Sequence, residues 1–395
     1  MDENFESAYR KQGSYKTLIN IMTIVLAVAV VLIYRSCNDG KNDGAYTENG
    51  VRFELCDLNG ASGLTEKMLG AIADGYENVN KYATGTKEWS IPEPVKHTWT
   101  ITSRKKGDPV SFEMKLSESP DMADAKIFTV TEPFCDVYNL KIGTKYYWTV
   151  TAKFSDGSEA TSRVTEYITA DTAPRVLYID GVTNCRDLGG WRTFEGQRVR
   201  QGMIIRTARY NDDGKESLNI TEKGIDTMVN TLGVKTELDL RRDEIRTESA
   251  LGAGVNYINI PMAGTVVSKI RDYDEKLRQV IGVFAVEENY PIAVHCSIGT
   301  DRTGLVCFLI NSLLGVQEND LYLDYVFSNF GHISSLRKAS EIKEQYLRVI
   351  NGFPGRTLPD RTEKYLLEIG VTQEEIDAIR NILLEEDSES AGADQ

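Results

Sequence analysis

A cysteine and an arginine that follow an apolar run are the residues of this chain best suited to chemistry. The run 291–294 is followed by His295 and Cys296, then by a polar loop to Arg302, then by the apolar stretch 305–314. This order predicts a buried strand, a tight loop and a buried helix. In that geometry the loop N–H groups and the helix N-terminus point at one place, which suits a phosphate-sized anion.

Cys296 and Arg302 take complementary roles at such a site. The positive end of the helix favours the thiolate of Cys296, which is the nucleophilic form. A guanidinium at the far end of a curled loop donates two N–H groups to the phosphate that the thiolate attacks. The Cys-x5-Arg spacing therefore predicts phosphate-ester cleavage through a phosphocysteine. An ordinary buried cysteine is the plain alternative, but it leaves the matching Arg302 unexplained.

Ester cleavage also needs a clamp for the phosphate oxygens and an acid for the leaving oxygen. Two acids compete for that second role, Asp301 in the loop and Asp239 at the end of a predicted strand, and each has a structural alternative. His295 is expected to order the loop and favour the thiolate. The residues expected to bind substrate, mostly through backbone amides, are Ser297, Ile298, Gly299, Thr300, Thr303 and Arg186. Thr303 is expected either to donate to the Cys296 sulfur or only to start the helix. Arg186 is expected either to contact phosphate or to act as scaffold with Asn184 and Asp187.

The loop HCSIGTDRTG, residues 295–304, resembles the signature of cysteine-dependent tyrosine phosphatases, in particular a bacterial branch that usually reads HCxxGKDRTG. The stretch NCRDLGG, residues 184–190, resembles the NxRDLGG opening of the same branch. The resemblance covers about 175–384 and implies an α/β phosphatase domain, with both Asp239 and Asp301 at characteristic positions. Thr300 stands where the branch often has lysine. That departure lowers the expectation of phosphoinositide or inositol-phosphate substrates and raises that of phosphotyrosine.

The pattern within 175–384 alternates helices and strands, which predicts a sheet flanked by helices with the loop at a strand's carboxyl end. The expected strands are 234–240 and 255–260, and the expected helices are 221–231, 273–284, 319–330, 334–350 and 372–384, the last opened by a Thr372-x-x-Glu375 capping box. The acidic residues 385–395 are expected to form a disordered tail.

Short alternating runs between residues 83 and 172 predict a second, all-β domain. Its aromatic positions, Trp99 and the pair Tyr147 and Trp148, resemble a fibronectin type III sandwich, and we expect them to be core or corner residues. No catalytic constellation lies in this domain, so a spacer or docking role is expected. Residues 35–82 are expected to form a stalk with one amphipathic helix.

Residues 18–34 are almost wholly apolar and are expected to anchor the chain in a membrane. Basic residues within 1–17 outnumber those just after the segment by one, which favours a cytoplasmic N-terminus and an external catalytic domain, periplasmic or extracellular. A lipidated Cys37 after a cleaved signal is the alternative, and it also tethers the protein to a membrane.

Composition sets further limits. The chain has 395 residues, 41% of them hydrophobic and 26% charged, with a net charge of −14, which argues against nucleic-acid partners. The six cysteines form no metal-binding spacing, so no metal or other cofactor is expected. A disulfide between Cys56 and Cys135 is conceivable in an exported protein. The partner expected is therefore a phosphorylated protein or small phosphomonoester, and the rival reading is a pseudophosphatase adaptor that only captures a phosphorylated ligand. Oligomeric state and regulation stay open.

Overall fold

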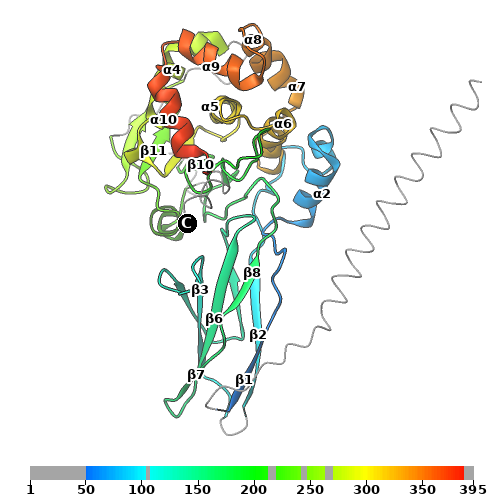
Figure 1. Ribbon diagram of the computed structural model, residues 1–395, viewed down its shortest axis with the longest axis vertical. Helices are drawn as coiled ribbons and strands as arrows, with labels where there is room; N and C mark the ends of the chain where they lie inside the picture. The colour runs from blue at the N-terminus through cyan, green and yellow to red at the C-terminus, as the bar shows by residue number, and fades with distance from the viewer. Residues whose placement is uncertain (1–49, 104–106, 212–218, 242–246, 263–269, 387–395) are drawn as a thin grey trace, which may run out of the picture.

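The computed structural model describes residues 50–103, 107–211, 219–241, 247–262 and 270–386. A β-rich region and an α/β region follow one another along the long axis of the molecule (Figure 1). The expected anchor at 18–34, the lipidation alternative at Cys37 and most of the acidic tail lie outside the described residues. Among the residues described, no helix combines the length and apolar character needed to cross a membrane.

The β-rich region consists of two antiparallel sheets. One has the strand order β1-β2-β5, and the other has the order β4-β3-β6-β7 with β8 also paired to β6. Side chains alternate along each strand, and the inward set from both sheets forms one core that includes Trp99, Trp148 and Tyr167. The strands are β1 (Val51–Leu55), β2 (Val95–Ser103), β3 (Ser111–Ser117), β4 (Lys126–Val130), β5 (Phe134–Val137), β6 (Lys145–Lys153), β7 (Glu159–Thr161) and β8 (Thr165–Ile168).

The β-rich region begins earlier than the boundary at residue 83 that the sequence suggests. Strand β1 pairs with β2 along its whole length, from Val51 opposite Ser103 to Leu55 opposite Trp99. Val51 and Phe53 are buried in the shared core. Residues 51–55 are thus part of the sheet and not of a stalk.

Residues 64–82, expected in the stalk, and residues 83–90, expected in the all-β domain, instead pack on the α/β region. Helix α2 (Glu66–Asp74) follows the N-cap Thr65, and the 3-10 helix η2 (Tyr76–Lys81) comes next. Met68 and Val79 are buried in the same core as the α/β helices. An amphipathic helix must cover its apolar face, and here the α/β region supplies the surface.

The α/β region is built on a five-stranded sheet of order β12-β11-β13-β10-β9, parallel except for β9. Both faces of β10, β11 and β13 are buried, as expected for a parallel sheet, whereas the edge strand β12 is partly exposed. In β13, Ile292 and Val294 face the core made with helices α4 (Asp274–Phe284) and α5 (Asp301–Leu313). Ala293 faces the smaller core made with Met228. The strands are β9 (Arg186–Asp187), β10 (Ile204–Thr207), β11 (Thr236–Asp239), β12 (Asn256–Asn259) and β13 (Ile292–His295).

The helices of this region agree with most sequence expectations. The helix expected at 221–231 is α3 followed by a π-helical turn, and the capping box at Thr372 is present. A helix that the sequence reading missed, α9, starts at another capping box, Thr357 with Asp360. The elements are α3 (Glu222–Asp226), η4 (Thr227–Thr231), η5 (Ile270–Tyr273), α4 (Asp274–Phe284), η6 (Glu287–Asn289), α5 (Asp301–Leu313), α6 (Glu318–Val326), η7 (Phe327–Phe330), α7 (Ala339–Ile342), η8 (Lys343–Leu347), α8 (Arg348–Ile350), α9 (Leu358–Glu368) and α10 (Gln373–Leu383).

Candidate active site

The loop between β13 and α5 lies at the carboxyl end of the central strand, where a parallel sheet presents its ligand site. The expected order of strand, loop and helix is thus confirmed. Gly299 turns the loop with a φ of +68°, and a Cβ there would come 2.3 Å from the carbonyl oxygen of Thr207. Only glycine fits this close approach of two backbones.

Cys296 is buried at the start of the loop and is a free thiol, as are the other described cysteines. The disulfide between Cys56 and Cys135 that is conceivable from the sequence is not formed, since both are free thiols. Burial opposes ionisation of Cys296, but the charge of Arg302 and the nearby donor groups of Thr303 and of the Ile298 N–H outweigh it and lower the pKa of the thiol. The site thus favours the nucleophilic form.

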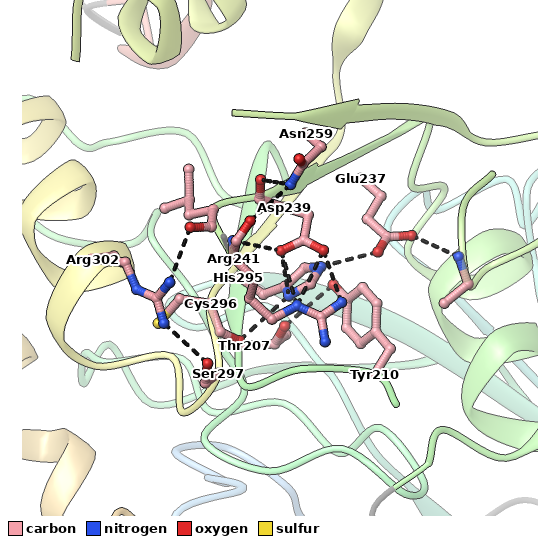
Figure 2. A network of polar contacts seen from close by, with 12 residues as sticks. Thr207, Tyr210, Glu237, Asp239, Arg241, Asn259, His295, Cys296, Ser297 and Arg302 are labelled. Atoms are coloured by element: carbon pink, nitrogen blue, oxygen red, sulfur yellow. Dashed lines mark hydrogen bonds and ion pairs between the residues drawn. The ribbon is translucent and has the colours of Figure 1, made fainter. Parts of the chain in front are cut away.

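Arg302 lies at the other end of the loop, and its guanidinium is held from two sides (Figure 2). Nη1 donates to the carbonyl oxygens of Leu240 at 3.2 Å and Met262 at 3.3 Å, and Nη2 donates to Ser297 Oγ at 3.0 Å. The carbonyls follow β11 and β12, so the sheet itself aims the cation at the loop. A positioned guanidinium is what a phosphate clamp requires.

Asp239 is the more buried of the two candidate acids. It ends β11 and is fully buried, with Arg241 donating to both carboxylate oxygens and Tyr257 Oη donating at 3.1 Å. Burial opposes ionisation, but the Arg241 hydrogen bonds and the nearby His295 and Arg241 charges lower the pKa of Asp239. The structure thus shows a paired, buried carboxylate at this position.

Asp301 is the first residue of α5 and lies on the other side of the loop. Arg337 donates from Nε to Oδ1 at 2.8 Å and from Nη2 to Oδ2 at 3.0 Å. The Asp301 side chain keeps 15% of its surface exposed, compared with 0% for Asp239. Of the two candidates, only Asp301 combines a place in the loop with contact to solvent.

Glu237 belongs to the site and was missed by sequence reasoning. Its Oε1 contacts His295 Nε2 at 3.0 Å, and its Oε2 accepts from Ser249 Oγ and the Ala250 N–H (Figure 2). The only available signal was a charged residue in the middle of a strand buried on both faces. Glu237 fixes the ring of His295, the residue directly before Cys296.

Glu237, Asp239 and His295 also present ligand atoms within 4.8 Å of one another. This closeness is of the kind that holds a metal ion. Each carboxylate, however, already accepts hydrogen bonds from protein donors, Glu237 from Ser249 and Asp239 from Arg241. A cation here would have to displace those donors, so the donor set fits an internal polar network better than a metal centre.

A second buried network, centred on Asp324, holds the backbone of the loop between β13 and α5. Asp324 on α6 pairs with Arg186, at 2.8 Å from Nε to Oδ1, and with Arg206. Arg206 Nη2 donates to the Gly299 carbonyl at 2.8 Å, and Asn184 Nδ2 donates to the Ile298 carbonyl at 2.9 Å. Burial opposes ionisation of Asp324, but the two arginines lower its pKa.

Two further expectations can be compared with this network. The Arg186 guanidinium donates to Asp324, Ser328 and the Asn184 side chain, which agrees with the expectation that it acts as scaffold. Direct contact of Arg186 with phosphate stays a prediction. Thr300 is buried, and its hydroxyl donates to the Ile298 carbonyl at 3.2 Å. Thr300, where the resembling bacterial branch often has lysine, is thus turned towards the inside of the loop.

Comparison with known proteins identifies the region that carries this site. A model described as the tyrosine phosphatase family matches residues 177–385, more than half of the chain. The chain belongs to the tyrosine phosphatase family. A putative tyrosine-protein phosphatase of Cupriavidus necator is 27% identical over 179 residues, which is 39% of this chain and 63% of that protein. The chain thus spans less than two thirds of this relative's length.

Solved structures give a more distant likeness for this chain. The core catalytic domain of the PP-IP phosphatase Siw14 from Saccharomyces cerevisiae, in complex with citrate, is 21% identical with a TM-score of 0.29, covering 38% of this chain and 82% of that one. A second structure of the Siw14 catalytic core is 18% identical with the same TM-score, covering 37% and 80%. At these values the likeness says nothing about substrate.

Proposed function

We propose that this phosphatase hydrolyses phosphotyrosine in proteins through a phosphocysteine intermediate. The Cys296 thiolate attacks phosphorus, the bond from phosphorus to the tyrosyl oxygen breaks, and that oxygen takes a proton from an acid. Water then attacks the phosphocysteine, which releases inorganic phosphate and restores the thiolate. The observation that carries the proposal is the loop between β13 and α5, which begins at the buried thiol of Cys296 and ends at the guanidinium of Arg302, held by Ser297 Oγ. The charge of Arg302 also lowers the pKa of this thiol.

Asp301 is the acid in this scheme. It lies in the loop that carries the nucleophile, and its side chain keeps some exposure, so it can meet a leaving oxygen. Asp239 lies behind His295 and is held by Arg241, which favours a supporting role for that carboxylate. The two roles are separated by experiment in the Discussion.

Substrate charge supports phosphotyrosine over more highly phosphorylated compounds. A lysine in the loop would add a cation for a second phosphate, whereas Thr300 is neutral and turned inward. Arg337, the cation next to Asp301, is already paired with that carboxylate. The loop is therefore suited to a substrate with a single phosphate.

The test uses the purified full-length protein in detergent with p-nitrophenyl phosphate and EDTA. We expect turnover that EDTA leaves unchanged and that Cys296→Ser reduces to background. Loss of turnover in EDTA, or full turnover by Cys296→Ser, would overturn the phosphocysteine route. A wild-type protein that binds phosphopeptides without turnover would instead be an adaptor.

Substrate class is tested by comparing kcat/KM for a phosphotyrosine peptide, a phosphoinositide in mixed micelles and a soluble inositol phosphate. We expect the peptide to be preferred. A preference of tenfold or more for either inositol compound would reassign the enzyme to lipid or inositol-phosphate chemistry with the same mechanism.

We also propose that residues 18–34 tether the enzyme to a membrane, with the catalytic domain outside the cytoplasm and the β-rich region acting as a fibronectin type III-like spacer. The apolar run and the charges around it support this proposal. Alkaline phosphatase fused after residue 60 is expected to be active, because that reporter works only after export. A silent fusion beside an active cytoplasmic reporter at the same position would reverse the assignment.

A further inference from the structure

Residues between strands β1 and β2 of the β-rich region contact the elements that support the loop carrying Cys296. Between α2 and β2 the chain runs along α6 and η7, where the Gly85 N–H donates to the Asn329 carbonyl at 2.8 Å and the Trp89 N–H donates to the Phe330 carbonyl at 2.6 Å. The next residue, Ser90, is buried. This segment lies outside the part of the chain that matches the phosphatase family, residues 177–385.

Ser90 contacts Asn184, whose side chain holds the loop at Ile298. Its Oγ accepts a hydrogen bond from the Asn184 N–H at 2.9 Å and donates to Glu88 Oε1. The other oxygen of Glu88 accepts from the His332 N–H at 3.1 Å. Glu88 and Ser90 thus link the segment both to Asn184 and to the turn after η7.

Asn184 has a left-handed backbone, with a φ of +54°, a conformation that asparagine adopts more readily than most residues. Its position here is set by its contacts, and the main-chain N–H is held by Ser90 Oγ. Its side chain is equally committed, since Oδ1 accepts from Arg186 Nη1 at 2.7 Å and Nδ2 donates to the Ile298 carbonyl at 2.9 Å. A shift in Asn184 therefore moves Ile298, whose N–H acts on the Cys296 sulfur.

We propose that Ser90 is a positioning residue for catalysis, which fixes Asn184 and through it the loop that carries Cys296. The proposal rests on the phosphatase activity proposed above for its kinetic readout. The β-rich region and the catalytic domain are then coupled, because β2 begins five residues after Ser90, at Val95. The link runs along the chain from β2 to Ser90 and then through hydrogen bonds, from the Asn184 N–H to Ser90 Oγ and from Asn184 Nδ2 to the Ile298 carbonyl.

The experiment compares Ser90→Ala with a matched control, Ser158→Ala, in the full-length protein. Ser158 makes the same local contacts as Ser90, with its N–H and Oγ both donating to the acid two residues earlier, Asp156. It lies in the turn between β6 and β7, at the end of the β-rich region away from the α/β domain (Figure 1). The control thus removes a similar hydroxyl without touching Asn184.

We expect Ser90→Ala to lower kcat for p-nitrophenyl phosphate about tenfold with a smaller change in KM, and Ser158→Ala to leave both unchanged. We also expect the pH midpoint for alkylation of Cys296 by iodoacetate to rise in Ser90→Ala, with the modified residue confirmed by mass spectrometry. A purely structural role would lower the melting temperature without moving this midpoint. Wild-type kcat together with a wild-type alkylation midpoint in a folded Ser90→Ala would overturn the proposal.

Two additions keep the outcome decisive. If Ser90→Ala does not fold, Glu88→Gln tests the same link, and we expect it to raise the alkylation midpoint by a smaller amount; an unchanged midpoint overturns the proposal. If the wild type turns over no phosphate ester, the proposed function fails, while the alkylation comparison still decides whether Ser90 positions the loop.

Discussion

Arg337 holds Asp301 by two parallel hydrogen bonds, from Nε to Oδ1 at 2.8 Å and from Nη2 to Oδ2 at 3.0 Å. This fork fixes the carboxylate at the first turn of α5, beside the loop that carries Cys296. Asp239 is held in a similar way by Arg241, but with no exposure to solvent. Each carboxylate is thus held by an arginine, but only that of Asp301 is exposed to solvent. Mutation of the two residues therefore compares an exposed carboxylate with a buried one.

Asp301→Asn is expected to slow the enzyme in proportion to the basicity of the leaving group. Turnover of phenyl phosphate should fall about 100-fold or more, since a general acid contributes at least this factor. p-Nitrophenyl phosphate should be affected much less, because its leaving group needs little protonation. The measurement is kcat for both substrates at one pH.

Asp239→Asn is the control for this experiment. We expect it to reduce turnover of both substrates to the same degree and to lower the melting temperature, because Arg241 loses the charge that compensates its burial. A leaving-group dependence seen in Asp239→Asn and absent from Asp301→Asn would exchange the two roles.

Thr303 provides a second test, through the ionisation of Cys296. Its hydroxyl is buried and forms no hydrogen bond within the described part of the chain. It lies near the Cys296 sulfur, where it lowers the pKa of the thiol. Thr303→Ala should therefore raise the pKa of Cys296, so that the thiolate is lost at a higher pH as the solution is acidified. The midpoint of iodoacetate inactivation against pH measures this shift.

Thr303→Ser keeps the hydroxyl and is the matched variant. It should retain the wild-type midpoint, while Thr303→Ala moves to higher pH. Equal midpoints in all three proteins would show that Thr303 serves only the start of α5.

The order of strand, loop and helix around Cys296 was predictable because these residues are adjacent in sequence. Cys296, Gly299 and Arg302 lie within one short loop, so their spacing alone indicates that they come together, and their roles in catalysis stay predictions. Glu237 was not predictable, because its partner His295 is 58 positions away and the two meet only through the pairing of β11 with β13. Sequence patterns show that a strand is buried, but not which buried polar groups face each other across a sheet.

The N-terminal boundary shows the same limit. The amphipathic helix near residue 68 was predictable from its own periodicity, and α2 is present. The surface that this helix covers was not predictable, because it is formed by residues far along the chain. Tyr76, just after α2, packs against Tyr322 with 4.9 Å between the ring centroids. Residues 64–90 therefore belong with the catalytic domain, although the β-rich region intervenes in sequence.

Met68→Ala should destabilise the catalytic domain for this reason. Met68 is fully buried in the core shared with the α/β helices, and truncation of such a side chain costs roughly 2–5 kcal/mol. The neighbouring Leu69 is 39% exposed, so Leu69→Ala is the matched control and should cost much less. Urea denaturation followed by phosphatase activity measures both. Equal effects of the two substitutions would contradict the packing of α2 on the catalytic core.

His97 makes the stability of the β-rich region depend on pH. The ring is fully buried between Trp148 and Tyr167, with Nε2 at 3.0 Å from Tyr167 Oη. Burial lowers the pKa of His97 to about 4, with the Val95 carbonyl opposing this shift in part. The folded protein therefore keeps this ring neutral in a pH range where the unfolded chain protonates it.

The sign follows from this difference. The stability that the neutral His97 contributes is present above about pH 6.5 and is lost as the pH falls towards about 4, by roughly 3 kcal/mol in total. His97→Gln should remove this component, whereas His332→Gln, at an exposed histidine, should not. The measurement is the free energy of unfolding in urea, followed by tryptophan fluorescence at pH 7.0, 5.5 and 4.5. If wild type and His97→Gln lose the same free energy between pH 7.0 and 4.5, the buried ring is not the source of the acid sensitivity.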